Sequence, residues 1–496
     1  MRNHKILLIN TSVVTIKQYK TSQGYPLGVM SIAAYLRENG YPDVTIIDFN
    51  EPGKYEQLGY YLEREKPDVV GLSGLSIDQE CIHSTAQRVK DWNSDCLVVC
   101  GGPYPSASWK RILSDGNLDI AIIGEGELTF IEILDKFYSG ITLENIKGTA
   151  FRTELGEIKK AVPREPIMDL DRLPYPAYDM INLDHYGSVQ SMAPVGERPY
   201  ISLFTSRACP YQCTYCHDIF GKTFRAMSAE KLVEQIEYYI AQYGIRDFEI
   251  YDDIWNLDRN RVRRFCEIVV AKGLKISFHF PNAIRMDIMD EELLTLVKKA
   301  GCVFMAVAVE SASKKIQKEI KKNNKIGKIK QNIAITDKVG IFSMGYFMIG
   351  FPNETYREIL QTCYFMVTSR LTTAIMFSVT PFEGTKLFEE TGSCADQSFK
   401  MEEYVYGDYK LSKVPKWLIR ATISVSYTLF YFNPVRVYKI FQRFPNRKYL
   451  LEKFYLTVKK LIVGVRFTKG RAIKSRLNDV PKQNLTKKAK PEAVTN

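Results

Sequence analysis

Short apolar runs that alternate with helical stretches constrain the fold of this 496-residue chain more than any other feature. The stretch 27–39, for example, carries apolar residues at helical spacing and ends at Gly40, a residue that favours helix termination. The apolar runs occupy residues 5–10, 44–48, 69–75, 97–100 and 119–123. Strands that alternate with helices at this spacing form a parallel sheet with helices on both faces. The alternation predicts a doubly wound, Rossmann-like α/β domain over residues 1–139.

Three of these runs end in glycine or other small residues. In a parallel sheet ligands bind at the carboxyl ends of the strands, where glycine lets a bulky group approach the backbone. Such glycines can also do no more than make tight turns. No G-x-G-x-x-G pattern follows the first run, which disfavours a nicotinamide or flavin dinucleotide. We therefore predict a different ligand at this edge, contacted by Ser73, Gly74, Gly101, Gly102, Gly124, Glu125 and Gly126.

Residues 140–199 form a predicted linker. Two short runs on either side of Gly156, at residues 149–152 and 157–159, favour a small hairpin. Residues 170–176 are expected to be extended, because a residue that precedes proline is disfavoured in a helix.

Three cysteines carry the strongest chemical signal. Cys209, Cys213 and Cys216 have the spacing C-x3-C-x2-C and follow the apolar run 200–204. Thiolates hold iron–sulfur clusters, usually four at a time, so three on one loop leave one iron open for another ligand. Structural zinc requires four closed ligands, and a redox pair of Cys213 and Cys216 would leave Cys209 unexplained. The spacing predicts a 4Fe–4S cluster with one open iron.

The cysteine loop, with Tyr215 just before its third cysteine, resembles the cluster loop of the radical S-adenosylmethionine (radical SAM) superfamily. The phrases at residues 26–28, 101–103 and 123–129 resemble the cobalamin-binding domain that precedes many of these enzymes. The resemblance covers residues 1–395 and implies a partial (β/α)6, TIM-like barrel over residues 200–395.

Six strand–helix units can be read after the linker, as this barrel requires. The expected strands occupy residues 200–204, 247–251, 276–280, 304–309, 342–349 and 375–380. Helices are expected near residues 228–243, 258–272, 290–300, 313–337 and 355–369.

The resemblance also implies three cofactors and their sites. S-adenosylmethionine would chelate the open iron and be cleaved to a 5′-deoxyadenosyl radical by an electron from an external donor such as flavodoxin or ferredoxin. Arg207 is expected to neutralise charge on the cluster or on a carboxylate. The implied S-adenosylmethionine contacts are Tyr215, Asp252, Asp253, Glu310, Ser311, Gly350 and Pro352. Cobalamin would lie on the glycine-rich strand ends of the first domain, without a protein histidine on cobalt, because the segment directly after Asn10 contains no histidine.

These cofactors favour radical methylation of an unactivated carbon in a small, lipid-like substrate. Cyclisation or rearrangement of a carbon skeleton occurs with the same domain layout and stays open as an alternative. A tRNA-modifying radical SAM enzyme would carry a β-barrel tail and a second cluster on three N-terminal cysteines, a pattern that Cys81, Cys96 and Cys100 do not repeat. A non-catalytic cobalamin or cluster sensor conflicts with the complete set of cofactor-side positions.

The C-terminal region is strongly basic, whereas the first 412 residues carry a net negative charge. Residues 413–470 hold 13 basic side chains and one acidic side chain, and residues 471–496 hold seven and two. We expect a basic, aromatic helical region over residues 396–470 and a disordered tail over residues 471–496. The segments 435–444 and 449–465 place apolar and basic residues on different faces, as in a membrane-surface helix, although helices that cap the enzyme body are the alternative.

The same pattern predicts where the protein acts. A nucleic-acid-modifying enzyme of this kind would be expected to carry a small β-barrel in its C-terminal region. Helices are expected there instead, so nucleic acid is an unlikely partner. No apolar stretch reaches the 18 residues of a spanning helix, and no secretion signal is recognised at the N-terminus. We therefore expect a cytoplasmic enzyme that associates peripherally with the inner face of the membrane.

Overall fold

The computed structural model describes residues 4–12, 24–189, 191–392, 411–444 and 450. The chain divides into two compact units, residues 1–445 and 446–496, and both main sheets lie in the first. The expected helix at 449–465 and the expected disordered tail at 471–496 lie outside the described residues, Leu450 excepted. The domain boundaries expected from the sequence stay predictions.

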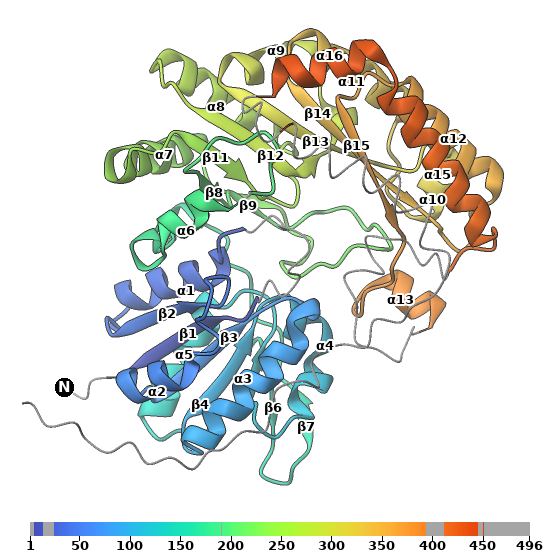
Figure 1. Cartoon of the computed structure of the whole chain (residues 1–496). Coiled ribbons are helices and arrows are strands. Elements are labelled where there is room, and N and C mark those ends of the chain that lie inside the picture. The colour runs from blue at the N-terminus through green and yellow to red at the C-terminus, as the bar shows by residue number, and fades with distance from the viewer. Residues whose placement is uncertain (1–3, 13–23, 190, 393–410, 445–449, 451–496) are drawn as a thin grey trace, which may run out of the picture. The chain divides into compact units, whose positions relative to one another are not determined.

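A seven-stranded sheet with helices on both faces forms the N-terminal part of this unit, as the strand–helix alternation predicts (Figure 1). The parallel strands lie in the order β2-β1-β3-β4-β5, and the linker hairpin β6–β7 extends the sheet in antiparallel fashion. The strands are β1 (Ile6–Asn10), β2 (Val44–Asp48), β3 (Val69–Ser73), β4 (Leu97–Gly101), β5 (Ile120–Ile122), β6 (Thr149–Arg152) and β7 (Ile158–Lys160). The helices are α1 (Leu27–Glu38), α2 (Leu58–Glu65), α3 (Gln79–Trp92), α4 (Pro103–Leu113) and α5 (Glu127–Tyr138), with a 3-10 turn at Ser76–Asp78.

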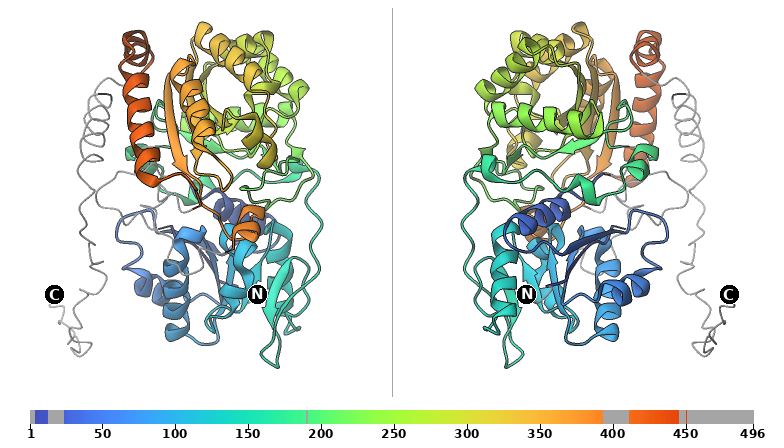
Figure 2. Two further views of the ribbon diagram at one scale, coloured as in Figure 1. Left: turned by 90° about the vertical axis from the view of Figure 1, so that its right-hand side faces the viewer. Right: turned by 90° about the vertical axis from the view of Figure 1, so that its left-hand side faces the viewer.

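The second sheet is a curved layer of six parallel strands with helices on its outer side (Figure 2). Its order is β8-β11-β12-β13-β14-β15, so all six expected barrel strands are confirmed. The strands are β8 (Ile201–Leu203), β11 (Asp247–Ile250), β12 (Ser277–Ile284), β13 (Cys302–Glu310), β14 (Phe342–Ile349) and β15 (Thr373–Ser378). The helices are α7 (Ala229–Tyr243), α8 (Arg259–Ala271), α9 (Glu291–Lys299), α10 (Lys314–Glu319), α11 (Ile326–Lys338), α12 (Tyr356–Thr368) and α13 (Lys386–Thr391).

Short elements connect the two sheets and frame the cysteine loop. They are the 3-10 turns Leu170–Arg172, Tyr178–Met180 and Met286–Ile288, helix α6 (Leu183–Ser188), and the two-residue strands β9 (Ser206–Arg207) and β10 (Arg225–Ala226).

The single helix expected near residues 313–337 is wrong, because α10 ends at Glu319 and α11 begins at Ile326. Between them Lys321 and Asn323 adopt left-handed conformations, with φ of 55° and 52°. Asparagine tolerates this conformation better than most residues, so the sequence itself permits the interruption. The break carries Lys322 to the end of strand β13, where it contacts the candidate site.

Helix α15 (Lys416–Tyr431) packs on α12 and covers the last strand of the barrel sheet (Figure 1). The backbone N–H of Met376, on β15, donates to the Tyr427 hydroxyl at 2.7 Å. Tyr356, at the start of α12, lies 3.1 Å from Thr422 through their hydroxyl groups. An open sheet edge exposes unpaired backbone groups, so α15 completes the edge that β15 would otherwise leave open.

Helix α16 (Pro434–Arg443) turns its basic face toward the protein, whereas a membrane-surface or ordinary surface helix would turn that face to water. Arg436 is only 6% exposed, and Lys439 and Arg443 pair with the buried Asp337 of α11 at 2.5 and 3.0 Å. The Phe444 side chain is buried, whereas Val437 and Phe441 point outward. The basic side chains therefore cap the enzyme body, and the apolar side chains face away from it.

We predict that replacing Arg436 by methionine lowers the free energy of unfolding by about 3 kcal/mol. The loss is expected because the buried guanidinium makes hydrogen bonds that methionine cannot replace. The guanidinium donates to the carbonyls of Val367, Leu371 and Ser369 at 3.3, 3.0 and 2.8 Å, and also to that of Phe430. These carbonyls lie at or beyond the C-terminal ends of α12 and α15, where intrahelical donors are missing. Denaturant unfolding measures the effect. Lys413→Met, at an exposed position, is the control, and equal stability of the two variants would contradict the prediction.

Candidate functional site

The cysteine loop, residues 208–224, is held between two short antiparallel strands, β9 and β10. Its centre is also fixed from both sides. The Thr214 N–H donates to the Ile320 carbonyl at the end of α10, and the Thr214 carbonyl accepts from the Leu387 N–H of α13, at 3.0 and 2.7 Å. The backbone of Cys216 donates to the Cys213 carbonyl at 3.2 Å, which makes a tight turn. These hydrogen bonds anchor the centre of the loop that carries the three cysteines.

The three thiols lie close enough to act on one another electrostatically. Desolvation first, and then the sulfur of Cys213, raise the pKa of both Cys209 and Cys216, the latter to about 12. Among the residues that the structure describes, no three His, Cys, Asp or Glu side chains converge where a single metal ion would bind. A cubane cluster places each thiolate on a different iron, so neighbouring but separate sulfurs suit it better than they suit one zinc ion.

A partly buried lysine that sequence reasoning missed lies beside the cluster loop, with 13% of its side chain exposed. Lys322 donates to the Glu310 carboxylate at 2.8 Å and to the Tyr215 hydroxyl at 3.1 Å. Burial disfavours its charge, but Glu310 and the sulfur of Cys213 outweigh burial and raise the pKa of Lys322. The structure therefore brings together two predicted residues, Tyr215 and Glu310, around an ammonium group that only the break between α10 and α11 could place there.

The two adjacent acids after β11 have different environments. Asp252 is buried and accepts hydrogen bonds from the Thr205 N–H, the Thr205 hydroxyl and the Ser206 hydroxyl at 2.5, 2.6 and 2.6 Å. Asp253 is exposed, and among the described residues it has no hydrogen-bond partner. Its charge acts on the pKa of both Cys209 and Cys216. Desolvation first, then the charge of Asp252, raises the pKa of Asp253 to about 6. Within the part of the chain that the structure describes, Asp253 alone offers a free carboxylate beside the cysteines.

The remaining predicted contacts lie at the ends of β13 and β14. Ser311 is fully buried, and its hydroxyl lies 3.2 Å from that of Thr362 on α12. The Gly350 N–H donates at 2.7 Å to Glu354, a buried acid that sequence reasoning did not single out. Burial raises the pKa of Glu354 to about 7. Pro352 lies in the turn between Gly350 and Glu354. The hydrogen bond to the Glu354 carboxylate closes this turn.

The glycine edge, defined as Gly74, Gly101, Gly102, Gly124 and Gly126, is the predicted cobalamin site. Close packing requires some of these glycines. A Cβ atom on Gly74 would lie 2.4 Å from the Thr11 hydroxyl, and one on Gly102, where φ is 94°, would lie 2.9 Å from the Ser73 hydroxyl. A Cβ on Gly101 would have its nearest neighbour at 3.9 Å. The edge therefore combines tight turns with more open backbone, and its binding function stays a prediction.

Arg207 neutralises carboxylates within this chain, which is one of the two alternatives expected from the sequence. Its guanidinium donates to Glu125 and Glu127, at the start of α5, at 2.8 and 2.5 Å. Glu125 also pairs with Arg225 at 2.5 Å. The Glu125 side chain is thus committed to two arginines, and a contact of this residue with cobalamin would have to come from its backbone.

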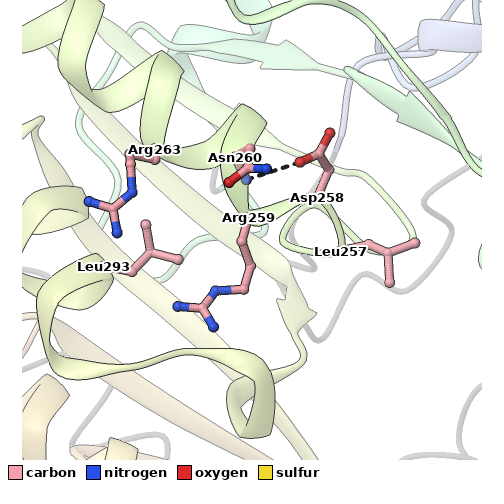
Figure 3. A pocket seen from close by; sticks show the side chains of 6 residues that line it. All are labelled: Leu257, Asp258, Arg259, Asn260, Arg263 and Leu293. Carbon is pink, nitrogen blue, oxygen red and sulfur yellow. Dashed lines mark hydrogen bonds between the residues drawn. The ribbon is translucent and has the colours of Figure 1, made fainter.

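An open hollow of about 470 Å³ lies away from these residues (Figure 3). The Asp258 side chain caps the start of α8, and Arg259 and Arg263 pair with the α9 residues Asp290 and Glu292. The hollow is lined by Leu257, Asp258, Arg259, Asn260, Arg263 and Leu293. None of these six belongs to the predicted site, and their charges already have partners within the protein.

Two family models match the chain where the two sheets are found. A B12 binding domain matches residues 16–134, and the Radical SAM superfamily matches residues 203–366. The uncharacterized methyltransferase PH0819 of Pyrococcus horikoshii is 30% identical over 394 residues, covering 78% of this chain and 83% of the relative. An anaerobic magnesium-protoporphyrin IX monomethyl ester cyclase of Rubrivivax gelatinosus is 25% identical over 440 residues, covering 86% and 77%.

The fold agrees with these matches. The radical S-adenosylmethionine methyltransferase TsrM of Kitasatospora setae, solved with cobalamin and a [4Fe-4S] cluster, superposes with a TM-score of 0.64 at 17% identity, over 78% of this chain and 77% of that one. Both sheets and the order of the two domains therefore define a cobalamin-binding radical SAM enzyme, and this chain belongs to that family. The cofactors of the family are cobalamin, a 4Fe–4S cluster and S-adenosylmethionine, as the sequence predicts.

We predict that changing Cys209, Cys213 and Cys216 together to alanine abolishes iron binding after anaerobic reconstitution, because the cluster loses its thiolates. The wild-type protein is expected to take up about four irons per chain. The matched control changes three cysteines outside the loop, Cys81, Cys266 and Cys302, to alanine. Burial raises the pKa of each of these thiols, so they are poorly suited to act as thiolate ligands. Iron retained in the first variant would contradict the assignment.

Proposed function

We propose that this enzyme transfers a methyl group from cobalamin to an unactivated carbon of a small, lipid-like substrate. The observation that carries the proposal is the set of cysteines, the free carboxylate of Asp253 and the partly buried ammonium of Lys322 at one end of the barrel sheet. Family membership supports the cofactor set. The relatives include proteins named as methyltransferases and a protein named as a cyclase, so methyl transfer is the step that needs testing.

Each polar side chain at this end of the sheet has a distinct proposed task. Cys209, Cys213 and Cys216 would hold the cluster, which supplies one electron for cleavage of S-adenosylmethionine. Asp253 would accept hydrogen bonds from the ammonium group of S-adenosylmethionine, since a carboxylate with a pKa of about 6 is mostly ionised at pH 7. Lys322 would hold the Glu310 carboxylate and Tyr215 in place beside the cluster loop.

Backbone groups complete the proposed S-adenosylmethionine site. Asp252 fixes Thr205 and Ser206, the residues that lead into the cysteine loop, and leaves the exposed position to Asp253. Glu354 fixes the turn at Gly350, where Pro352 and the backbone would lie against the adenine. Ser311 would act through its backbone, because its hydroxyl is already taken up by Thr362.

The distinction between methyl transfer and cyclisation can be tested without knowing the substrate. Reduced, cobalamin-loaded enzyme is incubated with S-adenosylmethionine that carries a deuterated methyl group. A methyltransferase yields deuteromethyl-cobalamin with S-adenosylhomocysteine, and separately 5′-deoxyadenosine with methionine. Mass spectrometry measures all four. Deoxyadenosine without labelled methylcobalamin would reject methyl transfer and favour cyclisation or rearrangement.

In the same assay Asp253→Asn is expected to lower deoxyadenosine formation about tenfold, because a charge-assisted hydrogen bond contributes about 1.5–3 kcal/mol. The exposed Asp95→Asn is the control. A variant at Asp253 with wild-type activity would remove this residue from the proposed site.

We further propose that the enzyme acts at a membrane surface, which would bring it to a lipid-like substrate. Among the described residues, no helix is long and apolar enough to cross a membrane. Helices α15 and α16 nevertheless turn large apolar side chains outward, with Trp417 70% and Phe432 79% exposed. The outer apolar face consists of Trp417, Val425, Leu429, Phe432, Val435, Val437, Tyr438 and Phe441.

Charge selects an anionic bilayer as the partner of this outer apolar face. Residues 411–444 contain no acidic residue, and although Arg436, Lys439 and Arg443 turn toward the enzyme body, the basic residues Lys413, Lys416 and Arg420 are exposed. Aromatic side chains at the surface of such a helix are typical of the boundary between lipid headgroups and acyl chains. Apolar contact, assisted by nearby positive charge, would then hold the protein on the membrane. Exposed apolar patches of this kind mark interaction sites more often than ordinary surface.

The membrane proposal predicts that full-length protein floats with anionic vesicles. Changing Trp417, Phe432 and Phe441 to serine is expected to reduce flotation at least fivefold, because the loss of apolar burial weakens binding by on the order of 1 kcal/mol. The matched control replaces three equally exposed apolar residues elsewhere, Leu155, Val162 and Met168, by serine. Equal flotation of the two variants, or flotation of neither variant nor wild type, would reject the membrane role.

A further inference from the structure

Four charged side chains tie the cysteine loop to the end of the first sheet. Arg207 and Arg225 are direct partners in the β9–β10 pair, so they lie opposite each other at the base of the loop. Glu125 and Glu127 follow β5, next to the glycine edge. These four residues are called the ion cluster below. Its ion pairs join Arg207 to Glu125 at 2.8 Å, Arg207 to Glu127 at 2.5 Å, and Arg225 to Glu125 at 2.5 Å.

Burial makes each member of the ion cluster depend on the others. All four side chains are 9% exposed or less. Like charges that face each other across two strands repel, and a buried charge without a partner is costly. Burial disfavours the ionised form of Glu127, but the charge of Arg207 outweighs burial and lowers the pKa of Glu127. The two arginines can therefore lie opposite each other only while the two glutamates are present.

Further contacts reach the loop itself. Arg225 donates to the Phe220 carbonyl at 3.1 Å, within the cysteine loop. A Cβ on Gly124 would lie 3.4 Å from the Ile219 carbonyl, so this part of the glycine edge touches the loop directly. Arg207 lies two residues before Cys209. Both ends of the cysteine loop are thus fixed to the turn that carries Gly124 and Gly126.

We propose that the ion cluster positions the cysteine loop relative to the glycine edge and thereby couples cluster assembly to cobalamin binding. The glutamates act through the arginines, so they are positioning residues and touch neither cofactor through their carboxylates. Loading of the cysteines would fix the loop, and the ion cluster would transmit that order to the turn at Gly124. Coupling of this kind is reciprocal, because each ligand favours the same arrangement. The inference rests on the proposed cofactor sites.

The test compares hydroxocobalamin affinity in protein with a reconstituted cluster and in protein from which iron has been removed by chelation. In the wild type we expect the dissociation constant to be about tenfold lower when the cluster is present, a typical coupling factor. In Glu127→Gln, which leaves Arg207 without one anionic partner, the ratio is expected to fall to about one. The control Glu165→Gln removes the partner of Lys147 in an exposed ion pair and should keep the wild-type ratio.

Arg207→Lys keeps the positive charge but loses the two-pronged contact, so it should retain folding and give an intermediate ratio. A wild-type ratio of one, or the full ratio in both Glu127→Gln and Arg207→Lys, would overturn the coupling. Failure of every form to bind hydroxocobalamin would instead remove the cobalamin site, and with it the coupling. If the variants have normal iron content, bind hydroxocobalamin and keep the wild-type ratio of dissociation constants, only this inference is rejected and the proposed enzymatic function stays intact.

Discussion

A charge inside a protein must find its partner within the fold, and the cysteine loop lies among several charges of this kind. Arg207 requires Glu127, and Lys322 requires Glu310. Asp252 requires the hydroxyl and amide donors of Thr205 and Ser206. Each pairing joins a residue near the loop to a different element, so the backbone around the cysteines is held from several directions. Pairing of buried charge, more than apolar packing, sets the position of the candidate site.

The sequence predicts the strands well because their signal is local. Apolar runs of suitable length become the parallel strands of both sheets, and the spacing of the three cysteines is itself a property of one short segment. Partners that come from distant segments could not be found in the same way. Arg207 and Glu127 are 80 residues apart, and neither has a sequence pattern that indicates the other. Lys322 depends on a helix break that its neighbours permit but do not require.

Helix α16 shows a second limit of sequence patterns. The alternation of apolar and basic residues separates two faces, Phe444 excepted, but it does not say which face turns inward. Basic side chains usually face water, yet the carbonyls at the ends of α12 and α15, together with Asp337, provide enough acceptors to bury Arg436, Lys439 and Arg443. Their inward position follows from unpaired helix-end acceptors on neighbouring elements, which no local pattern contains.

The residues on the inner face and on the outer face of α15 are explained by different causes. Its inner face carries Tyr427 and Thr422, which satisfy the edge strand β15 and helix α12, so the needs of the fold are met there. Nothing in the described structure requires the outer positions to be apolar, and a helix that served only as a cap would be expected to place polar residues at Trp417, Val425 and Leu429. Their apolar character is therefore a property of the surface itself, and the proposed contact with a membrane would give these side chains a role.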